Sequence, residues 1–159
     1  MIESAGLLMF RDSHELEIFL VHPGGPYWAN QDKWGIPKGK VEDNEEILEA
    51  AIREFNEETG ITVDSCFMIY IGTSKTSTKM IHAWAFRKDF QGVIVSNKAE
   101  IEYPAKSGKK IFIDEVDEGR YFSIEEAKTK IHKSQLPLLE SFLKVYNENG
   151  GNHEKENEN

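Results

Sequence analysis

Apolar runs of strand length recur along the chain and are separated by polar segments. Near the amino terminus a polar stretch, 11–15, separates two such runs, which is typical of two strands joined by a turn. Further along, polar and apolar residues alternate, as they do in a strand with one covered face. The pattern predicts strands at 2–10, 16–21, 67–72, 79–86, 110–114 and 120–122.

Apolar residues at helical spacing predict a first helix over residues 44–59. Asp43 and Glu46 match a capping box at its start, and Gly60 can take the left-handed conformation that ends a helix. At about 100° per residue, the apolar side chains cover a stripe roughly 140° wide, which is enough to seat the helix on a core. The stripe consists of Ile47, Leu48, Ala51, Ile52 and Phe55.

Two more helices are predicted in the carboxyl-terminal part of the chain. Ser123 and Glu126 match a capping box for a helix over 124–132. A last helix over 136–146 tolerates Pro137 because proline is accepted in the first helical turn. Strands interspersed with amphipathic helices predict an α/β fold, in which helices cover both sides of a mixed sheet.

Three carboxylates lie on one edge of the first predicted helix. Glu54, Glu57 and Glu58 fall within roughly 100° of arc, beside the apolar stripe. Like charges at this spacing repel one another, and partial burial makes their ionisation more costly. A divalent cation reverses both effects, and carboxylate oxygens are ligands that Mg²⁺ and Mn²⁺ prefer. The pattern therefore predicts a site for Mg²⁺ or Mn²⁺.

The alternative interpretation of these acids is a solvated, acidic end of a helix. That interpretation predicts lysines placed one turn away from the acids. Within 44–59 the basic residue is Arg53, which lies four residues before Glu57 and could orient it. The acidic surface is therefore the weaker of the two interpretations.

Residues 39–61 resemble the Nudix box, a glycine, five residues, a glutamate, seven residues and then Arg-Glu-apolar-x-Glu-Glu-x-Gly-apolar. Phe55 stands where that family usually has an aliphatic residue, which affects packing and no chemistry. Residues 34–40 resemble the strand and loop that precede the box in Nudix hydrolases acting on dinucleoside polyphosphates. The resemblance implies a Nudix α/β/α sandwich with a central mixed β-sheet. The positions in register are Gly39, Glu45, Arg53, Glu54, Glu57, Glu58, Gly60 and Ile61.

The resemblance also implies roles for residues of the box. Glu54 and Glu58 are expected to be metal ligands, and Glu57 a further ligand or the catalytic base. The main-chain carbonyl of Lys38 is a common ligand in the family. Gly39 would let the main chain approach the metal or a phosphate closely. We therefore assign catalysis to Glu57, Glu54 and Arg53, and metal binding to Glu54, Glu57, Glu58 and Lys38.

Residues around the box are candidates for substrate binding, each with a structural alternative. Lys38 and Lys40 would contact phosphate, or else are solvated loop lysines. Tyr27 and Trp28 lie in a loop rich in glycine and proline and would stack a nucleobase, or else pack against the protein. Lys109 and two neighbouring lysines form a basic turn, which suits a polyphosphate or is simply exposed surface.

Two glutamates outside the box compete with Glu57 for the role of base. Glu100 and Glu102 could supply an additional metal ligand or the base from a mobile loop, as loop glutamates do in some Nudix enzymes. The competing interpretation places both in an edge strand, where acidic side chains maintain solubility. The sequence leaves this choice open.

Length and composition limit the remaining classes of protein. The 159 residues are expected to form one domain, 1–147, followed by a disordered acidic tail, 148–159, that has no apolar side chain. The net charge of −9 argues against binding to nucleic acid. A single cysteine and the lack of a long apolar run favour a cytoplasmic protein without a membrane partner.

Together these features predict a metal-dependent pyrophosphohydrolase. The resemblance implies a nucleotide or dinucleotide substrate, in which a nucleoside diphosphate is linked to another moiety. Residues 34–42 and 82–86 look most like those of diadenosine tetraphosphate hydrolases, which favours diadenosine polyphosphates. Within the family the same box serves ADP-ribose, nucleoside triphosphates and diphosphoinositol phosphates, so these stay open as alternatives. A non-catalytic Nudix module that senses a nucleotide is a further alternative, although such modules generally lose box glutamates and this chain keeps them.

Overall fold

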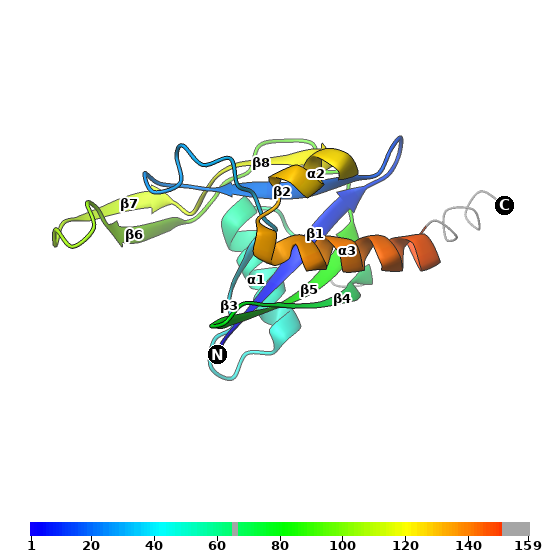
Figure 1. Ribbon diagram of the computed structural model, residues 1–159, viewed down its shortest axis with the longest axis horizontal. Coiled ribbons are helices and arrows are strands. Elements are labelled where there is room, and N and C mark those ends of the chain that lie inside the picture. The colour runs from blue at the N-terminus through cyan, green and yellow to red at the C-terminus, as the bar shows by residue number, and fades with distance from the viewer. Residues whose placement is uncertain (65–66, 151–159) are drawn as a thin grey trace.

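A computed structural model describes residues 1–64 and 67–150 of the chain (Figure 1). Within these residues, no helix combines the length and the apolar character needed to cross a lipid bilayer. The strands are β1 (Ile2–Arg11), β2 (Glu17–Pro23), β3 (Lys38–Lys40), β4 (Ile69–Lys75), β5 (Lys79–Arg87), β6 (Lys98–Glu102), β7 (Lys110–Asp114) and β8 (Val116–Ser123). The helices are α1 (Ile47–Thr59), α2 (Ile124–Lys130) and α3 (Leu136–Val145), with a 3-10 turn η2 (Lys133–Gln135) and a π-helical turn η3 (Tyr146–Gly150).

The central sheet is mixed and has the strand order β4-β5-β1-β2-β8. β1 runs parallel to β5, whereas the other neighbouring pairs are antiparallel. β1 pairs with β2 at its carboxyl end, through Phe10 and Arg11, but with β3 near its amino end, through residues 4–6. Gly35 bridges Val21 of β2. The segment that leads into β3 therefore contacts both strands, and it brings β3 beside α1.

Alternate residues of the central strands face two separate cores. Leu7 of β1 and Phe19 of β2 point toward α1, where they join the cluster that contains Phe55. Leu8 and Leu20 point to the opposite face, which is covered by α2 and α3. Because the sheet buries apolar side chains on both faces, it needs helices on both. Figure 1 shows this arrangement, which confirms the predicted α/β/α sandwich with a central mixed sheet.

The predicted start of α1 was wrong. The helix begins at Ile47 rather than at residue 44, because Asn44 has a φ of 64°, in the left-handed region that an α-helix cannot include. Glu46 precedes the helix without a side-chain cap, so the predicted capping box is not formed. The predicted end is confirmed, since Gly60 has a φ of 75° and terminates the helix.

Other predicted elements are present with shifted boundaries. β4 begins at Ile69 rather than at residue 67. β8 begins at Val116 and is longer than predicted, because it pairs with β2 over most of that strand. The predicted cap of α2 is confirmed, since the Ser123 hydroxyl accepts a hydrogen bond from the main-chain N–H of Glu126 at 3.2 Å.

β6 and β7 form a separate two-stranded hairpin that projects from the body of the fold (Figure 1). β6 was not predicted from the apolar pattern. It contains Glu100 and Glu102, which therefore lie in a strand rather than in a loop. The Tyr27 hydroxyl donates a hydrogen bond to the carbonyl of Glu102 at 2.7 Å, so the loop after β2 braces the hairpin.

The carboxyl-terminal residues lie only partly within the described structure. Residues 148–150 belong to η3 and continue the helical path of α3. Residues 151–159, most of the predicted acidic tail, lie outside the described residues. The boundary between domain and tail therefore stays a prediction.

Candidate metal centre and active site

Three carboxylates from two parts of the chain lie together beside α1. Glu54 and Glu58 are about one helical turn apart and project from the same side of the helix. Glu115 comes from the connection between β7 and β8. One carboxylate oxygen of each residue lies within 4.8 Å of the other two. Glu58 is buried, with 6% of its surface exposed, so the cluster has a dry side and an accessible side.

The cluster is unfavourable for three negative charges without a cation. Burial, followed by repulsion from Glu54 and Glu115, raises the pKa of Glu58 to about 9. Burial also raises the pKa of Glu54, against the attraction of Arg53. A divalent ion would compensate these charges, and a set of oxygen donors suits a hard cation such as Mg²⁺ or Mn²⁺. The residues present therefore fit a divalent metal ion.

β3 brings the main chain directly against Glu54. A β-carbon built on Gly39 would lie 2.0 Å from Cδ of Glu54, which no side chain could accept. Glycine is required at this position because it alone lacks a β-carbon. The structure places Gly39 against a carboxylate of the cluster, and its approach to a metal or a phosphate stays a prediction. The main chain of the adjacent Lys38 also hydrogen-bonds the carboxylate of Glu58.

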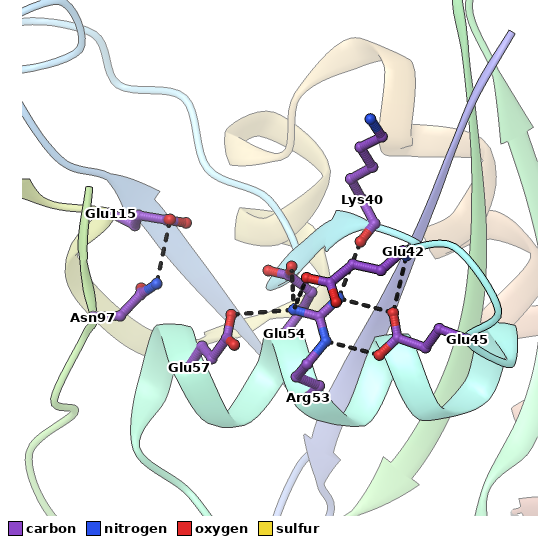
Figure 2. Close-up of polar contacts among 8 residues, drawn as sticks. All are labelled: Lys40, Glu42, Glu45, Arg53, Glu54, Glu57, Asn97 and Glu115. Atoms are coloured by element: carbon purple, nitrogen blue, oxygen red, sulfur yellow. Dashed lines mark hydrogen bonds and ion pairs between the residues drawn. The ribbon is translucent and has the colours of Figure 1, made fainter. Parts of the chain in front are cut away.

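Arg53 connects the acids of the box through a network of hydrogen bonds (Figure 2). Its Nε and Nη2 atoms donate to the two carboxylate oxygens of Glu45 at 2.8 and 3.0 Å. Nη1 donates to Glu54 at 2.9 Å and to Glu57 at 3.3 Å, and Nη2 also donates to the carbonyl of Lys40 at 3.1 Å. These bonds to Arg53 lower the pKa of Glu45 to about 2. The guanidinium therefore orients these carboxylates, and its N–H donors are all engaged by acceptors within the protein.

Glu57 lies at the edge of the cluster rather than inside it. Its side chain is 40% exposed and forms an ion pair with Arg53, and it is not among the three acids that converge. The structure thus brings together two of the predicted metal ligands, Glu54 and Glu58. The assignments of Glu57 as ligand or base, and of the Lys38 carbonyl as a ligand, stay predictions.

A pocket of about 480 Å³ opens beside the carboxylates. Glu58 and Glu115 form part of its wall, together with Lys33, Lys38 and Lys79. Burial, followed by repulsion from Lys79, lowers the pKa of Lys38, so the two lysines share a confined space. The pocket therefore joins an acidic centre to a cationic surface.

The predicted substrate-binding residues fall into two groups. Lys38 and Trp28 line the pocket, and Trp28 is 39% exposed, so its ring is accessible. Tyr27 instead packs against the β6–β7 hairpin. Lys40 is exposed beside the box, and Lys109 lies in the turn of the projecting hairpin, and neither lines the pocket.

Sequence reasoning missed Glu115 and considered other acids in its place. Glu102 is engaged elsewhere, because its carboxylate accepts hydrogen bonds from the main-chain N–H groups of Lys106 and Gly108 in the hairpin turn. The available signal for Glu115 was its position directly after a predicted strand, 110–114. That position alone does not place Glu115 near the cluster, because the sequence between α1 and Glu115 does not predict how the two segments lie relative to each other.

Comparisons with known proteins agree with this geometry. A family model of the NUDIX domain matches residues 2–142. The structure is similar to that of an Ap4A hydrolase from C. elegans in a binary complex, with a TM-score of 0.67 at 22% identity over 89% of this chain and 96% of that one. The E. coli ORF135 protein gives a TM-score of 0.60 at 26% identity, over 91% and 90% of the two chains.

A third similar structure is the NUDIX domain of NrtR from Shewanella oneidensis in complex with ADP ribose. It gives a TM-score of 0.63 at 13% identity, over 91% of this chain and 87% of that one. Identities this low show a common fold, whereas the family model covers most of the chain. The residues that the family motif requires are also those that surround the acidic cluster. This chain therefore belongs to the Nudix family and is a pyrophosphohydrolase of that family.

Proposed function

We propose that this enzyme hydrolyses a phosphoanhydride bond of a dinucleoside polyphosphate, with diadenosine tetraphosphate as the preferred substrate and Mg²⁺ or Mn²⁺ as the metal. The observation that carries the proposal is the presence of carboxylates and lysines on the wall of one pocket. The acidic end would hold a divalent ion together with a diphosphate of the substrate. A longer polyphosphate extends from there along the cationic surface, which a simple diphosphate would leave unused.

The acidic end of the pocket is suited to hold the metal. Glu54, Glu58 and Glu115 would hold it, together with the main-chain carbonyl of Lys38. When bound, a divalent ion neutralises the phosphate oxygens and supplies an activated water. Arg53 keeps Glu54 directed into the cluster through the hydrogen bond of 2.9 Å. Gly39 leaves the space that this carboxylate occupies.

Glu57 is the residue that we assign as general base. Arg53 donates to Oε2 of Glu57 at 3.3 Å, which fixes the direction of the carboxylate. Its exposed side chain can take a proton from water and release it to solvent. The hairpin acid Glu102 is less suited to this role, because two main-chain N–H groups already occupy its carboxylate.

The lysines of the pocket support a substrate with more than two phosphates. Within the described residues, Lys79 has no acidic side chain within 4.0 Å of its ammonium group, so its positive charge is available to a ligand. Lys38 lines the same pocket, where burial lowers its pKa. Polyphosphates carry several negative charges that such groups neutralise. Trp28 lies on the same wall and offers a ring on which a nucleobase can stack.

The similar structures support the same class of substrate without deciding between its members. One of them is named as an Ap4A hydrolase, and another was obtained in complex with ADP ribose. Diadenosine tetraphosphate and ADP-ribose both contain a nucleoside diphosphate linked to a second moiety. The test therefore has to compare both compounds directly on this enzyme.

The first test is analysis of reaction products by chromatography. The enzyme is incubated with Mg²⁺ or Mn²⁺ and with diadenosine tetraphosphate, ADP-ribose, nucleoside triphosphates or a diphosphoinositol phosphate. We expect conversion of diadenosine tetraphosphate to ATP and AMP, faster than any other reaction and abolished by EDTA. Faster cleavage of another compound would change the assigned substrate and leave the proposed mechanism in place. No cleavage of any compound would favour a nucleotide-sensing module.

A pair of lysine variants tests the cationic wall. Lys79→Met removes a charge from the pocket, and we expect the KM for diadenosine tetraphosphate to rise about tenfold, with a smaller effect on ADP-ribose. Lys75→Met is the matched control, because Lys75 is exposed on the neighbouring strand and does not line the pocket. Equal effects of the two variants on both substrates would show that the wall does not select for polyphosphate length.

A further inference from the structure

Asn97 connects the carboxyl-terminal end of α1 to Glu115. Its main-chain N–H donates to the carbonyl of Glu57 at 2.8 Å, and its carbonyl accepts a hydrogen bond from the N–H of Glu115 at 3.0 Å. Its side-chain Nδ2 atom donates to Oε1 of Glu115 at 3.3 Å (Figure 2). One residue outside the Nudix box thus contacts both the helix and the acid that the box does not supply.

The side-chain amide of Asn97 has one orientation that the site allows. Its Oδ1 atom is buried and has no hydrogen-bond partner within the described part of the chain, which is unusual for a buried polar atom. Reversing the amide would place Oδ1 against Glu115, and an ionised carboxylate can only accept hydrogen bonds. The interaction with Glu115 therefore determines how this amide lies, even though its oxygen is left unpaired.

Glu115 needs such support because of its place in the fold. Glu54 and Glu58 are fixed by the rigid backbone of α1, whereas Glu115 lies in the short connection between β7 and β8. Ser96 holds the same connection, since its hydroxyl accepts a hydrogen bond from the main-chain N–H of Val116 at 3.0 Å. Residues 96 and 97 together fasten the connection to α1. Of these contacts, the Asn97 amide is the one that reaches the carboxylate.

We propose that Asn97 is a positioning residue that directs the Glu115 carboxylate toward Glu54 and Glu58 and thereby sets the metal affinity of the site. The inference rests on the proposed function, in which these three acids hold the divalent ion. The amide binds Oε1 of Glu115, and the same carboxylate is one of the three that converge in the cluster. Residues that orient a ligand in this way typically change metal affinity by about 10- to 100-fold when they are removed.

A double-mutant cycle on Mn²⁺ binding tests this role. The dissociation constant of Mn²⁺ is measured without substrate, by electron paramagnetic resonance of the free ion, in wild type, Asn97→Ala, Glu115→Gln and the double variant. Alanine keeps both main-chain hydrogen bonds of residue 97 and removes only the amide. Asn97→Ser is measured in parallel, in case the alanine variant folds poorly. Asn56→Ala is the control, because the Asn56 side chain donates to the main-chain carbonyl of Ile61 and projects from the side of α1 opposite to Glu54 and Glu58.

We expect Asn97→Ala to weaken Mn²⁺ binding about tenfold when Glu115 is present and less than twofold when Glu115 is glutamine. Asn56→Ala should leave the affinity unchanged. If Asn97→Ala and Asn97→Ser bound Mn²⁺ as wild type does while Glu115→Gln bound it much more weakly, the role of Asn97 would be overturned and the metal site kept. The same conclusion would follow if Asn97→Ala weakened binding equally with glutamate and with glutamine at position 115. If the wild-type protein bound no Mn²⁺, the proposed function would fail and the role of Asn97 with it.

Discussion

Gly39 and Glu54 approach so closely that position 39 cannot carry a side chain. The Cδ atom of Glu54 lies 2.0 Å from the place that a β-carbon of residue 39 would occupy. On its other side the Glu54 carboxylate accepts a hydrogen bond from Arg53 at 2.9 Å. β3 and α1 can come together at this point only because glycine leaves room for a carboxylate between them. The contact therefore explains why the family motif begins with a glycine that lies far from its acids in sequence.

The variant Gly39→Ala tests this contact. The added methyl group would displace either β3 or the Glu54 carboxylate, since their overlap is far below any van der Waals distance. Overpacking of this kind costs about 1–3 kcal/mol of folding free energy, and displacement of a metal ligand should lower turnover by at least tenfold. Urea unfolding measures the first effect, and the rate of metal-dependent hydrolysis measures the second.

Lys40→Ala is the matched control for this variant. Its side chain is exposed, and the carbonyl that accepts from Arg53 is retained. We expect stability within about 0.5 kcal/mol of wild type. A Gly39→Ala protein that kept normal stability and turnover would show that the close approach is not needed.

The variant Glu58→Gln separates the effect of the carboxylate cluster on the stability of the metal-free protein from its role in metal binding. Glu58 is buried, and its pKa is raised to about 9 by burial and by two neighbouring carboxylates, so removal of its charge should not destabilise the metal-free protein. Metal binding should then suffer. Wild type should gain thermal stability on addition of Mg²⁺, because a ligand that binds the native state stabilises it. Glu58→Gln should lose most of that gain and most of its turnover.

Glu49→Gln provides the comparison, because it removes an exposed glutamate from the first turn of the same helix. Its melting temperature should still rise with Mg²⁺, to the same extent as that of wild type. Differential scanning calorimetry with EDTA and with Mg²⁺ gives all the values required. An equal rise in Glu58→Gln and wild type would remove Glu58 from the metal site.

The acidic face of α1 could be predicted from the sequence because its information is local. The spacing of Glu54 and Glu58 fixes their common direction once the segment is helical, and Gly60 marks where the helix ends. The two-sided core was also predictable, since strands interspersed with amphipathic helices favour a sheet with helices on both faces. These features depend on residues that are close together in the chain.

Features that depend on distant residues were not predictable. Glu115 joins the cluster because the β6–β7 hairpin leaves it beside α1, a relationship between segments more than fifty residues apart. The true start of α1 was hidden because Glu45, which looked like part of a helix, is used to bind Arg53. Lys79 enters the pocket through the pairing of β5 with β1. In each case a tertiary contact overrides the local pattern.

Glu45 should make a pH-dependent contribution to stability. Its hydrogen bonds with Arg53, followed by one from the main chain of Glu42, lower its pKa to about 2 in the folded protein. Because this is below the unfolded value of about 4.3, the stabilisation is complete above the unfolded pKa and is lost as the pH falls toward the folded one. Glu45→Gln should therefore cost about 2 kcal/mol at pH 7 and progressively less below about pH 4.3.

Urea unfolding between pH 7 and pH 3 measures this difference. Glu46→Gln is a suitable control, because Glu46 is the exposed neighbour and makes no side-chain cap. Its effect should be small and nearly independent of pH. A destabilisation by Glu45→Gln that did not decrease on acidification would show that the charge of Glu45 is not the source of its contribution.

His22 should contribute in the opposite direction. Burial lowers its pKa, but hydrogen bonds to the carbonyl of Gln31 at 2.6 Å and to the carboxylate of Asp117 at 2.9 Å outweigh burial, so that the pKa is raised. In the protonated ring both nitrogens donate, and each has an acceptor in place. A raised folded pKa gives stability that is complete below the unfolded value of about 6.5 and is lost as the pH rises through the folded value.

The variant His22→Gln should therefore destabilise the protein more at pH 6 than at pH 9, with a loss of about 1–2 kcal/mol at the lower pH. His14→Gln replaces an exposed histidine and should show no such dependence. His22 connects Asp117 of β8 to Gln31, which belongs to the loop that also carries Trp28. This connection between the loop and β8 should therefore weaken as the pH rises from 6 to 9. Amide hydrogen exchange of residues 27–33 measures that change directly. Exchange that stayed constant from pH 6 to pH 9, after correction for the intrinsic rate, would mean that the loop is held by contacts other than the protonated His22.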